Sequence, residues 1–242
     1  MKLKLADPTL FTKSIELLCE LVLEVRIKIT EFGLSIVAID PGNISMVSLK
    51  IPKSAFKEFD SDEEVLGVNL ENLKKVLRRA SKTSELVLEK KENALEIKIE
   101  DKIKRVFSLN LIEVEREDKD FPDHLEFSSV VTMDSADLID SIDDCLVVSD
   151  ACSFIVDGKN FIIEAKETNS ARAEFSGDEL EIKAENCFVR YSLEYLQKFM
   201  KAGKYFPKAT LKFATDHPLR MDFTSEHLSL SFLLAPRVET ED

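Results

Sequence analysis

The sequence Leu-Glu-Asn-Leu-Lys-Lys at residues 70–75 returns 123 positions later as Leu-Glu-Tyr-Leu-Gln-Lys at residues 193–198. A second pair of stretches, 11–18 and 138–145, shares its apolar spacing at an offset of 127. Apolar residues three and four positions apart predict an amphipathic helix in each of the four stretches. A period near 125 residues is too long for a solenoid, so the sequence predicts two similar domains.

Short alternating segments surround these helices in the same order in both halves, and they predict strands. In the first half they are residues 25–30, 34–39, 45–51, 86–89, 94–99 and 105–111. In the second half they are residues 153–156, 160–165, 171–175, 209–213, 220–223 and 228–234. Aspartates that precede the first helix of each half, Asp7 and Asp134, predict N-caps. The fold class predicted is α+β.

A charged segment close to the midpoint separates the halves. It centres on Phe121-Pro122, and a proline stops a helix and favours an extended residue before it. We therefore predict an N-terminal domain at residues 1–112, an interdomain connector at 113–127 and a C-terminal domain at 128–242.

The charge is unevenly distributed. The chain carries 33 Lys and Arg against 46 Asp and Glu, a formal net charge of −13. Residues 72–84 and 195–212 nevertheless hold five cations each and no acidic residue. On a helix, Lys74, Arg78 and Lys82 would follow one face, as would Lys198 and Lys201. Because both windows occupy repeat-equivalent places, contact with nucleic-acid phosphate explains them better than a solvated helix face does.

No reaction centre is evident from motifs. The sequence has no Gly-x-Gly-x-x-Gly, Walker-type or Gly-x-Ser-x-Gly pattern, so we do not expect an enzyme or a catalytic residue. The four cysteines form no Cys-x-x-Cys pair and lie at no metal-ligand spacing from a histidine, so we expect reduced thiols, no metal and no cofactor. No apolar run has the roughly 18–20 residues of a membrane helix, and the start lacks a signal-peptide pattern. The expectation is a soluble intracellular chain without a membrane partner.

Five features in order resemble the proliferating cell nuclear antigen family of DNA sliding clamps, in its archaeal branch. They are Ala-Ile-Asp-Pro at 38–41, Gly-Val-Asn-Leu at 67–70, the connector proline Pro122, Leu-Val-Val-Ser-Asp at 146–150 and Leu-Leu-Ala-Pro-Arg-Val-Glu at 233–239. The resemblance covers essentially the whole chain. It implies two clamp domains with helices on one face of antiparallel sheets, and a ring of three subunits around duplex DNA.

The resemblance also implies a function and partners. Such rings have no catalytic activity and act as processivity factors that tether DNA polymerase, flap endonuclease and DNA ligase, after a clamp loader places them on DNA. The implied location is the cytoplasm of an archaeal-type cell, or the nucleus if the source is eukaryotic. The alternatives are a subunit of a heterotrimeric or checkpoint-type ring and, more distantly, an enzyme with a novel carboxylate site.

Three sets of site residues follow from the basic windows and from the resemblance. The expected DNA-facing residues are Lys13, Lys74, Lys75, Arg78, Arg79, Lys82, Lys198, Lys201 and Lys204. The expected pocket for a partner's motif, an apolar socket for its anchors, comprises Ile39, Asn43, Ile44, Phe121, Pro218, Leu233, Ala235, Pro236 and Val238. The expected subunit interface comprises Arg79, Lys82, Arg105, Phe107, Leu109, Asp137, Asp140, Asp144, Arg172 and Phe175.

Two positions depart from the family. Lys119 stands where the connector often has an aliphatic residue, which affects the upper rim of the pocket. The helix after Asp134 is anionic outward, and the family places it beside the subunit boundary, where it would not serve DNA. We hypothesise that its aspartates pair with Arg79, Lys82 and Arg105 of the neighbouring subunit, and that the edge strand 105–111 meets 171–175 of that neighbour.

Overall fold

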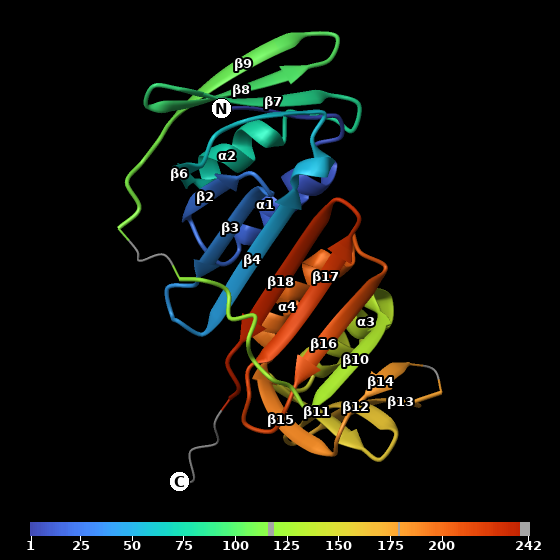
Figure 1. Ribbon diagram of the computed structural model, residues 1–242. Coiled ribbons are helices and arrows are strands. Elements are labelled where there is room, and N and C mark those ends of the chain that lie inside the picture. The colour runs from blue at the N-terminus through green and yellow to red at the C-terminus, as the bar shows by residue number, and fades with distance from the viewer. Residues whose placement is uncertain (116–118, 179, 238–242) are drawn as a thin grey trace. The chain divides into compact units, whose positions relative to one another are not determined.

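The computed structural model describes residues 1–115, 119–178 and 180–237, which divide into two compact units (Figure 1). Unit 1 contains Met1–Pro41, Val47–Phe121 and Ser225–Leu230, and unit 2 contains Gly42–Met46, Pro122–Thr224 and Ser231–Asp242. The main division therefore lies at Phe121 and Pro122, inside the segment predicted as the connector.

The first half of the chain forms nine strands, two α-helices and one short 3-10 helix, counted over the described residues. They are β1 (Lys2–Leu5), α1 (Thr9–Leu18), β2 (Glu24–Thr30), β3 (Gly33–Ile39), β4 (Ser45–Pro52), η1 (Lys53–Ala55), β5 (Glu58–Asp60), β6 (Glu64–Asn69), α2 (Leu70–Leu77), β7 (Glu85–Lys91), β8 (Ala94–Glu100) and β9 (Lys104–Asn110). One sheet has the order β5-β1-β7-β8-β9, and the strands β4-β3-β2-β6 follow one another in a second.

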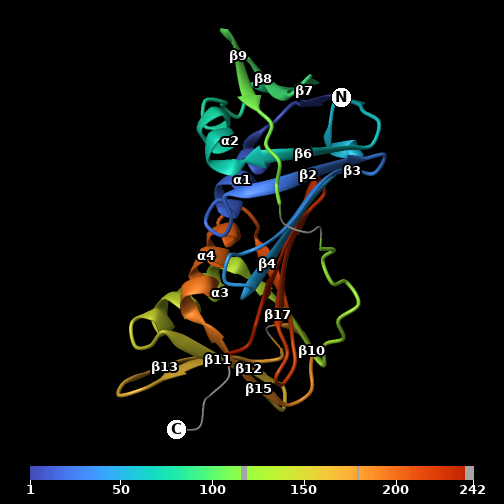
Figure 2. The same ribbon diagram turned by 90° about the vertical axis from the view of Figure 1, so that its left-hand side faces the viewer.

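The two helices of unit 1 pack together on one side of its strands (Figure 2). Helix α1 buries Phe11, Ile15 and Leu18, which recur at the helical period and match its predicted apolar face. The predicted N-cap at Asp7 is wrong by one residue, because Pro8 occupies the N-cap position and no side chain caps the helix. Asp7 Oδ1 instead accepts a hydrogen bond from the N–H of Thr9 at 2.9 Å, just before the helix.

Gly67 on β6 lets the start of the connector run close to the sheet. The N–H of Ile112 donates to the carbonyl of Gly67 at 3.0 Å. A Cβ atom on Gly67 would lie only 1.9 Å from the carbonyl oxygen of Ile112, so no other residue fits there without a backbone shift. The guanidinium of Arg26 also donates to the carbonyl of Val114. These contacts hold residues 112–114 against β6 and β2.

The second half repeats the order of the first. Its elements are β10 (Ser129–Asp134), α3 (Ser135–Leu146), β11 (Ala151–Asp157), β12 (Asn160–Lys166), β13 (Ser170–Phe175), β14 (Glu181–Lys183), β15 (Cys187–Ser192), α4 (Leu193–Gly203), β16 (Lys208–Phe213), β17 (Leu219–Ser225) and β18 (Leu228–Leu234). One sheet has the order β13-β12-β11-β15, and β14-β10-β16-β17-β18 follow one another in the other.

Aromatic side chains fill the core of unit 2. Phe154 makes edge-on contacts with Phe161, Tyr191 and Phe213, at ring-centroid distances of 5.6, 5.4 and 5.8 Å. The ring of Phe199 on α4 stacks on Phe232 of β18 at 4.4 Å. Such pairs add about 0.5–1.5 kcal/mol each beyond the burial of their area. The Phe199–Phe232 pair joins α4 to β18, and α3 packs beside α4 (Figure 2).

The predicted two-domain α+β fold with antiparallel sheets is confirmed, and all strand pairs with an assigned register are antiparallel. Sequence patterns did not predict β1, β5, β6, β10, β14 or β15. The predicted cap at Asp134 is wrong in its chemistry, because Asp134 precedes α3 in extended conformation but its side chain makes no capping hydrogen bond. Within the described ranges, no helix is both long enough and apolar enough to cross a bilayer.

Candidate functional site

Helix α2 carries the first set of predicted DNA-facing cations. The side chain of Asn69 caps it by accepting from the N–H of Asn72 at 3.0 Å, and its apolar face is buried in unit 1. The helix ends at Leu77, with Arg78 as its C-cap. The prediction that Lys82 continues the helical stripe is therefore wrong, because Lys82 lies in the turn that follows. Lys75, Arg79 and Lys82 are exposed, whereas Lys74 is partly buried and lies 3.9 Å from Glu71.

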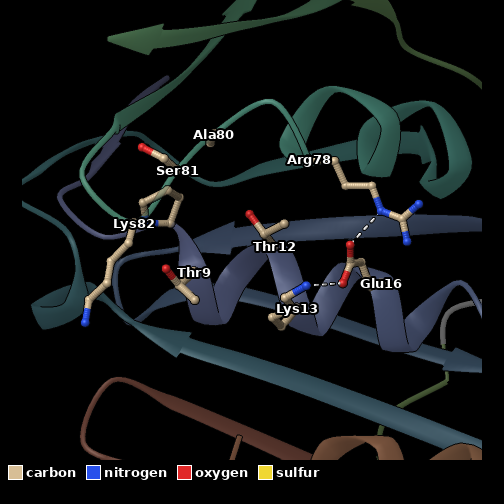
Figure 3. Close-up of a pocket in the computed structure, with 9 residues that line it drawn as sticks. Thr9, Thr12, Lys13, Glu16, Arg78, Ala80, Ser81 and Lys82 are labelled. Carbon is tan, nitrogen blue, oxygen red and sulfur yellow. Dashed lines mark hydrogen bonds and ion pairs between the residues drawn. The ribbon is translucent and has the colours of Figure 1, made fainter. Parts of the chain in front are cut away.

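Helix α1 contributes a carboxylate that the sequence did not connect with the basic window. Glu16 Oε1 accepts from Arg78 Nε at 2.6 Å, and Glu16 Oε2 accepts from Lys13 Nζ at 2.8 Å (Figure 3). These side chains border a cavity of about 250 Å³ between the first turns of α1 and the loop after α2. No local signal could reveal the pair, since Glu16 and Arg78 are 62 residues apart.

Helix α4 carries the cations of unit 2. It buries Leu193, Leu196 and Phe199 and leaves its opposite side toward solvent. Lys198 pairs with Glu194 one turn earlier at 2.8 Å, and its ammonium lies 4.9 Å from the centre of the Tyr195 ring. Lys201 and Lys204 are both exposed, the latter at the C-cap, where a cation complements the helix dipole.

Helix α3 presents a row of carboxylates. Asp137, Asp140 and Asp144 are exposed, while Leu138 and Ile142 point into the core. Within the described ranges of the chain, none of these three carboxylates forms an ion pair or accepts a hydrogen bond. The helix therefore carries three exposed carboxylates without a partner among the described residues.

Strands β9 and β13, which contain the other predicted interface residues, are each the last strand of a sheet. Phe107 and Leu109 on β9 are half-buried, and Phe175 on β13 stacks on Phe161 at 6.2 Å. The two predicted arginines have partners in this chain. Arg105 bonds to the carboxylate of Asp101 and to the carbonyl of Arg79, and Arg172 pairs with Glu164 and Glu174, each at 3.1 Å.

The residues predicted for the motif pocket lie in both units. In unit 2, the N–H of Ala235 donates to the carbonyl of Ile44 at 2.9 Å, Leu233 is buried and Pro218 is half-buried. Asn43 and Ile44 are exposed, and Asn43 has a left-handed φ of 54°. Pro236 is half-buried. In unit 1, Ile39 is half-buried and Phe121 is buried. Val238 lies outside the described residues.

Two arginines outside the three predicted sets of site residues fix segments next to these pocket residues. Arg237 forms hydrogen bonds of 2.6 and 2.8 Å with both carboxylate oxygens of Asp150, and these hold the pKa of Asp150 below its usual value. Arg220 donates to Asp123 at 3.0 Å and so ties the second part of the connector to β17.

In the described parts of the chain, His, Cys, Asp and Glu form no group of three that could hold a metal ion. Three cysteines are buried and Cys19 is partly buried, and all four are free. Burial raises the pKa of the Cys152 thiol well above its usual range.

Comparison with known proteins identifies the family. Residues 1–120 match the family model described as proliferating cell nuclear antigen, N-terminal domain. A DNA polymerase sliding clamp from Thermococcus gammatolerans is 35% identical over 228 residues, covering 90% of this chain and 91% of that protein. Another from Pyrococcus abyssi is 34% identical over 246 residues, covering 95% of each.

Solved structures agree over almost the whole chain. The PCNA2–PCNA3 complex from Sulfolobus tokodaii has a TM-score of 0.89 at 25% identity, over 99% of this chain and 100% of the other. The proliferating cellular nuclear antigen from Entamoeba histolytica, at 24% identity and a TM-score of 0.90, covers 98% of each chain and supports the fold. The repeat, the antiparallel sheets and these matches place the chain in the proliferating cell nuclear antigen family.

Proposed function

We propose that this chain is a DNA polymerase processivity factor, a sliding clamp whose ring encircles duplex DNA. The observation that carries the proposal is the match over 90% or more of the chain to proteins named DNA polymerase sliding clamp. The cation-bearing helices α2 and α4, one in each unit at repeat-equivalent places, support it. Lysines and arginines on helices can follow a phosphate backbone without reading bases.

The ring would be a trimer of this chain. Strand β9 of one subunit would pair with β13 of the next, and the α3 aspartates would lie near the neighbour's Arg79 and Lys82. The free edges of both sheets and the unpaired carboxylates of α3 support this arrangement. Native mass spectrometry tests it: a species near three times 27.5 kDa supports a homotrimer. A chain that assembles only when mixed with unlike subunits would contradict it.

The clamp would act by tethering and would not be an enzyme. Its partners would be DNA polymerase, a clamp loader, flap endonuclease and DNA ligase, held through the apolar socket that includes Ile44, Pro218 and Leu233. The archaeal sources of the relatives support a cytoplasmic location. No chemistry is required of the chain itself, since an enzyme bound in the socket of a ring that is topologically linked to DNA stays on its template.

Charge reversal tests the DNA-facing surface. The variant carries Lys74→Glu, Arg78→Glu, Lys198→Glu and Lys201→Glu. We expect it to lose stimulation of polymerase on primed template while it keeps the native mass of the wild type. A control with four reversals at other exposed lysines, Lys53, Lys91, Lys159 and Lys166, has the same change in net charge. Undiminished stimulation by the first variant, or equal loss in both, would refute the proposed surface.

A further inference from the structure

Glu16 occupies a distinctive place among the cations of unit 1. Its carboxylate lies between Lys13 and Arg78, at 2.8 and 2.6 Å, and the side chain is only 18% exposed (Figure 3). Burial tends to raise the pKa of Glu16, but the hydrogen bonds from Lys13 and Arg78 outweigh it and hold the pKa below its usual value. Glu16 is therefore ionised at neutral pH, and one negative charge is shared by two cations.

Glu16 bonds to Arg78 Nε and to Lys13 Nζ, two donors that could also bind a phosphate. A guanidinium and an ammonium bind carboxylate and phosphate oxygens through the same kind of charge-assisted hydrogen bond. Lys82, at the other end of the cavity in Figure 3, has its ammonium directed away from Glu16, and it forms no ion pair with the described residues. A phosphate that approached Lys13 and Arg78 would have to displace the Glu16 carboxylate or accept its repulsion.

We propose that Glu16 competes with DNA phosphate for Lys13 and Arg78, and so weakens the hold of this surface on duplex DNA. The inference rests on the proposed sliding-clamp function. Affinity for DNA rises with each phosphate that a protein neutralises, and it falls with salt in proportion. A ring already linked to DNA by topology gains nothing from tight phosphate contacts, which would resist its movement. A resident carboxylate keeps two cations in place while reducing their net pull on the backbone.

Burial distinguishes Glu16 from the other carboxylates near these cations. Glu194 beside Lys198 and Glu71 beside Lys74 have side chains that are 73% and 49% exposed. Exposed pairs within a helix are worth only a few tenths of a kcal/mol and can be displaced readily. Glu16 is only 18% exposed and bonds both to Lys13 of α1 and to Arg78 at the C-cap of α2, so it is the carboxylate that a phosphate would displace at the greatest cost.

The test is an equilibrium titration of a fluorescent DNA duplex with the full-length protein over a series of salt concentrations. Glu16→Gln removes the charge and keeps the length of the side chain. We expect it to bind duplex about fivefold more tightly than the wild type at low salt. The plot of log affinity against log salt should steepen by about one, the slope of one further phosphate contact. Glu31→Gln, at an exposed turn position, makes the same change in net charge and serves as the control.

A double-mutant cycle separates competition at the site from a general change of charge. Lys13→Gln should weaken DNA binding more in the Glu16→Gln background than in the wild type, because the released lysine then contacts phosphate directly. The same lysine substitution combined with Glu31→Gln should show no coupling. A second charge-removing variant, Glu16→Ala, should agree with Glu16→Gln if charge is the cause. Unfolding curves of every variant give the folded fraction to which affinities are normalised.

Different results would refute the competition by Glu16 and the DNA-facing surface on which the inference rests. If Glu16→Gln binds no more tightly than Glu31→Gln, or the cycle shows no coupling, the competition is refuted even where Lys13→Gln and Arg78→Gln weaken binding. If Lys13→Gln and Arg78→Gln leave affinity unchanged in both backgrounds, this part of the proposed DNA-facing surface is refuted as well. Tighter binding by both Glu16 variants, with coupling to Lys13 alone, supports the inference.

Discussion

Arg237 and Asp150 form a bidentate ion pair that fixes the chain directly after β18. Nη1 and Nη2 of Arg237 donate to the two carboxylate oxygens of Asp150, at 2.6 and 2.8 Å, and the backbone N–H of Arg237 donates to the carbonyl of Arg190 at 2.8 Å. These three bonds set the path of Ala235 and Pro236, which belong to the proposed motif pocket. The pair thus positions a surface and does not fill the core.

Removing the pair should affect partner binding more than stability. Both side chains are largely exposed, so Asp150→Asn should cost about 0–1 kcal/mol of unfolding free energy. We expect a peptide bearing the clamp-binding motif to bind about threefold more weakly, with Tm nearly unchanged. Arg237→Gln should have the same effect, and the double variant should be no worse than either single one. Additive losses measured by calorimetric titration would show that the two residues act separately.

Gly67→Ala should destabilise unit 1. Its new Cβ would lie 1.9 Å from the carbonyl oxygen of Ile112, so residues 112–114 would have to leave the edge of β6. Overpacking of this kind costs about 1–3 kcal/mol, measurable by denaturant unfolding. Val65→Ala, an exposed position on the same strand, provides the control and should change stability little. A Gly67→Ala protein as stable as the wild type would show that the connector start does not need this close approach.

Glu85 should make the sheet that contains β1 and β7 sensitive to acid. Hydrogen bonds from Lys57 and Lys4 lower the pKa of Glu85 from 4.5 to about 2. A carboxyl with a lowered pKa in the folded state contributes stability above its unfolded pKa and loses that contribution as pH falls through the folded value. The difference in Tm between the wild type and Glu85→Gln should therefore be full at pH 5 and above and shrink between pH 4.5 and pH 2. A difference that stays constant to pH 2 would rule out this linkage.

The proposed ionic subunit boundary should loosen with salt. Individual exposed ion pairs contribute about 0–1 kcal/mol and are screened at high ionic strength. We expect Asp140→Lys on α3 to lower the proportion of trimer seen by light scattering at low salt, whereas Asp157→Lys at the exposed end of β11 should not. The wild-type trimer should dissociate progressively toward molar salt. An assembly that stays unchanged over that range would exclude an ionic boundary.

The two-domain repeat could be predicted because helices with one apolar face carry their period in the sequence. Strand β1 was not predicted, although Lys-Leu-Lys-Leu alternates and Leu3 and Leu5 are buried. Four residues are too few for the alternation to be distinguished from chance. The end of α2 was harder to predict. Hydroxyl groups of Ser81, Thr83 and Ser84 bond within the turn and to the backbone N–H of Ser81, and such local bonds compete with helix.

The sequence could not predict which charged side chains from distant segments lie next to one another. The basic window at residues 72–84 has no acidic residue, yet the fold brings Glu16 to Arg78 from α1. In the same way, Arg105, whose charge alone favoured a role at the subunit boundary, donates to the carbonyl of Arg79, 26 residues away. Periodicity shows which face of a helix is polar. Which charges neighbour one another across that face depends on packing between elements that are far apart in the chain.

Any opened form of the proposed ring would expose the free edges of β9 and β13. A subunit that offers two unlike edges joins others head to tail, and such contacts either close on themselves or grow without limit. Opening one joint would uncover a row of unpaired backbone groups on each side, with exposed Ile103 and Val106 beside one of them. Bare strand edges of this kind recruit other chains and aggregate. The opened state would therefore need to be brief or shielded, so whatever opens the ring must also act as its chaperone.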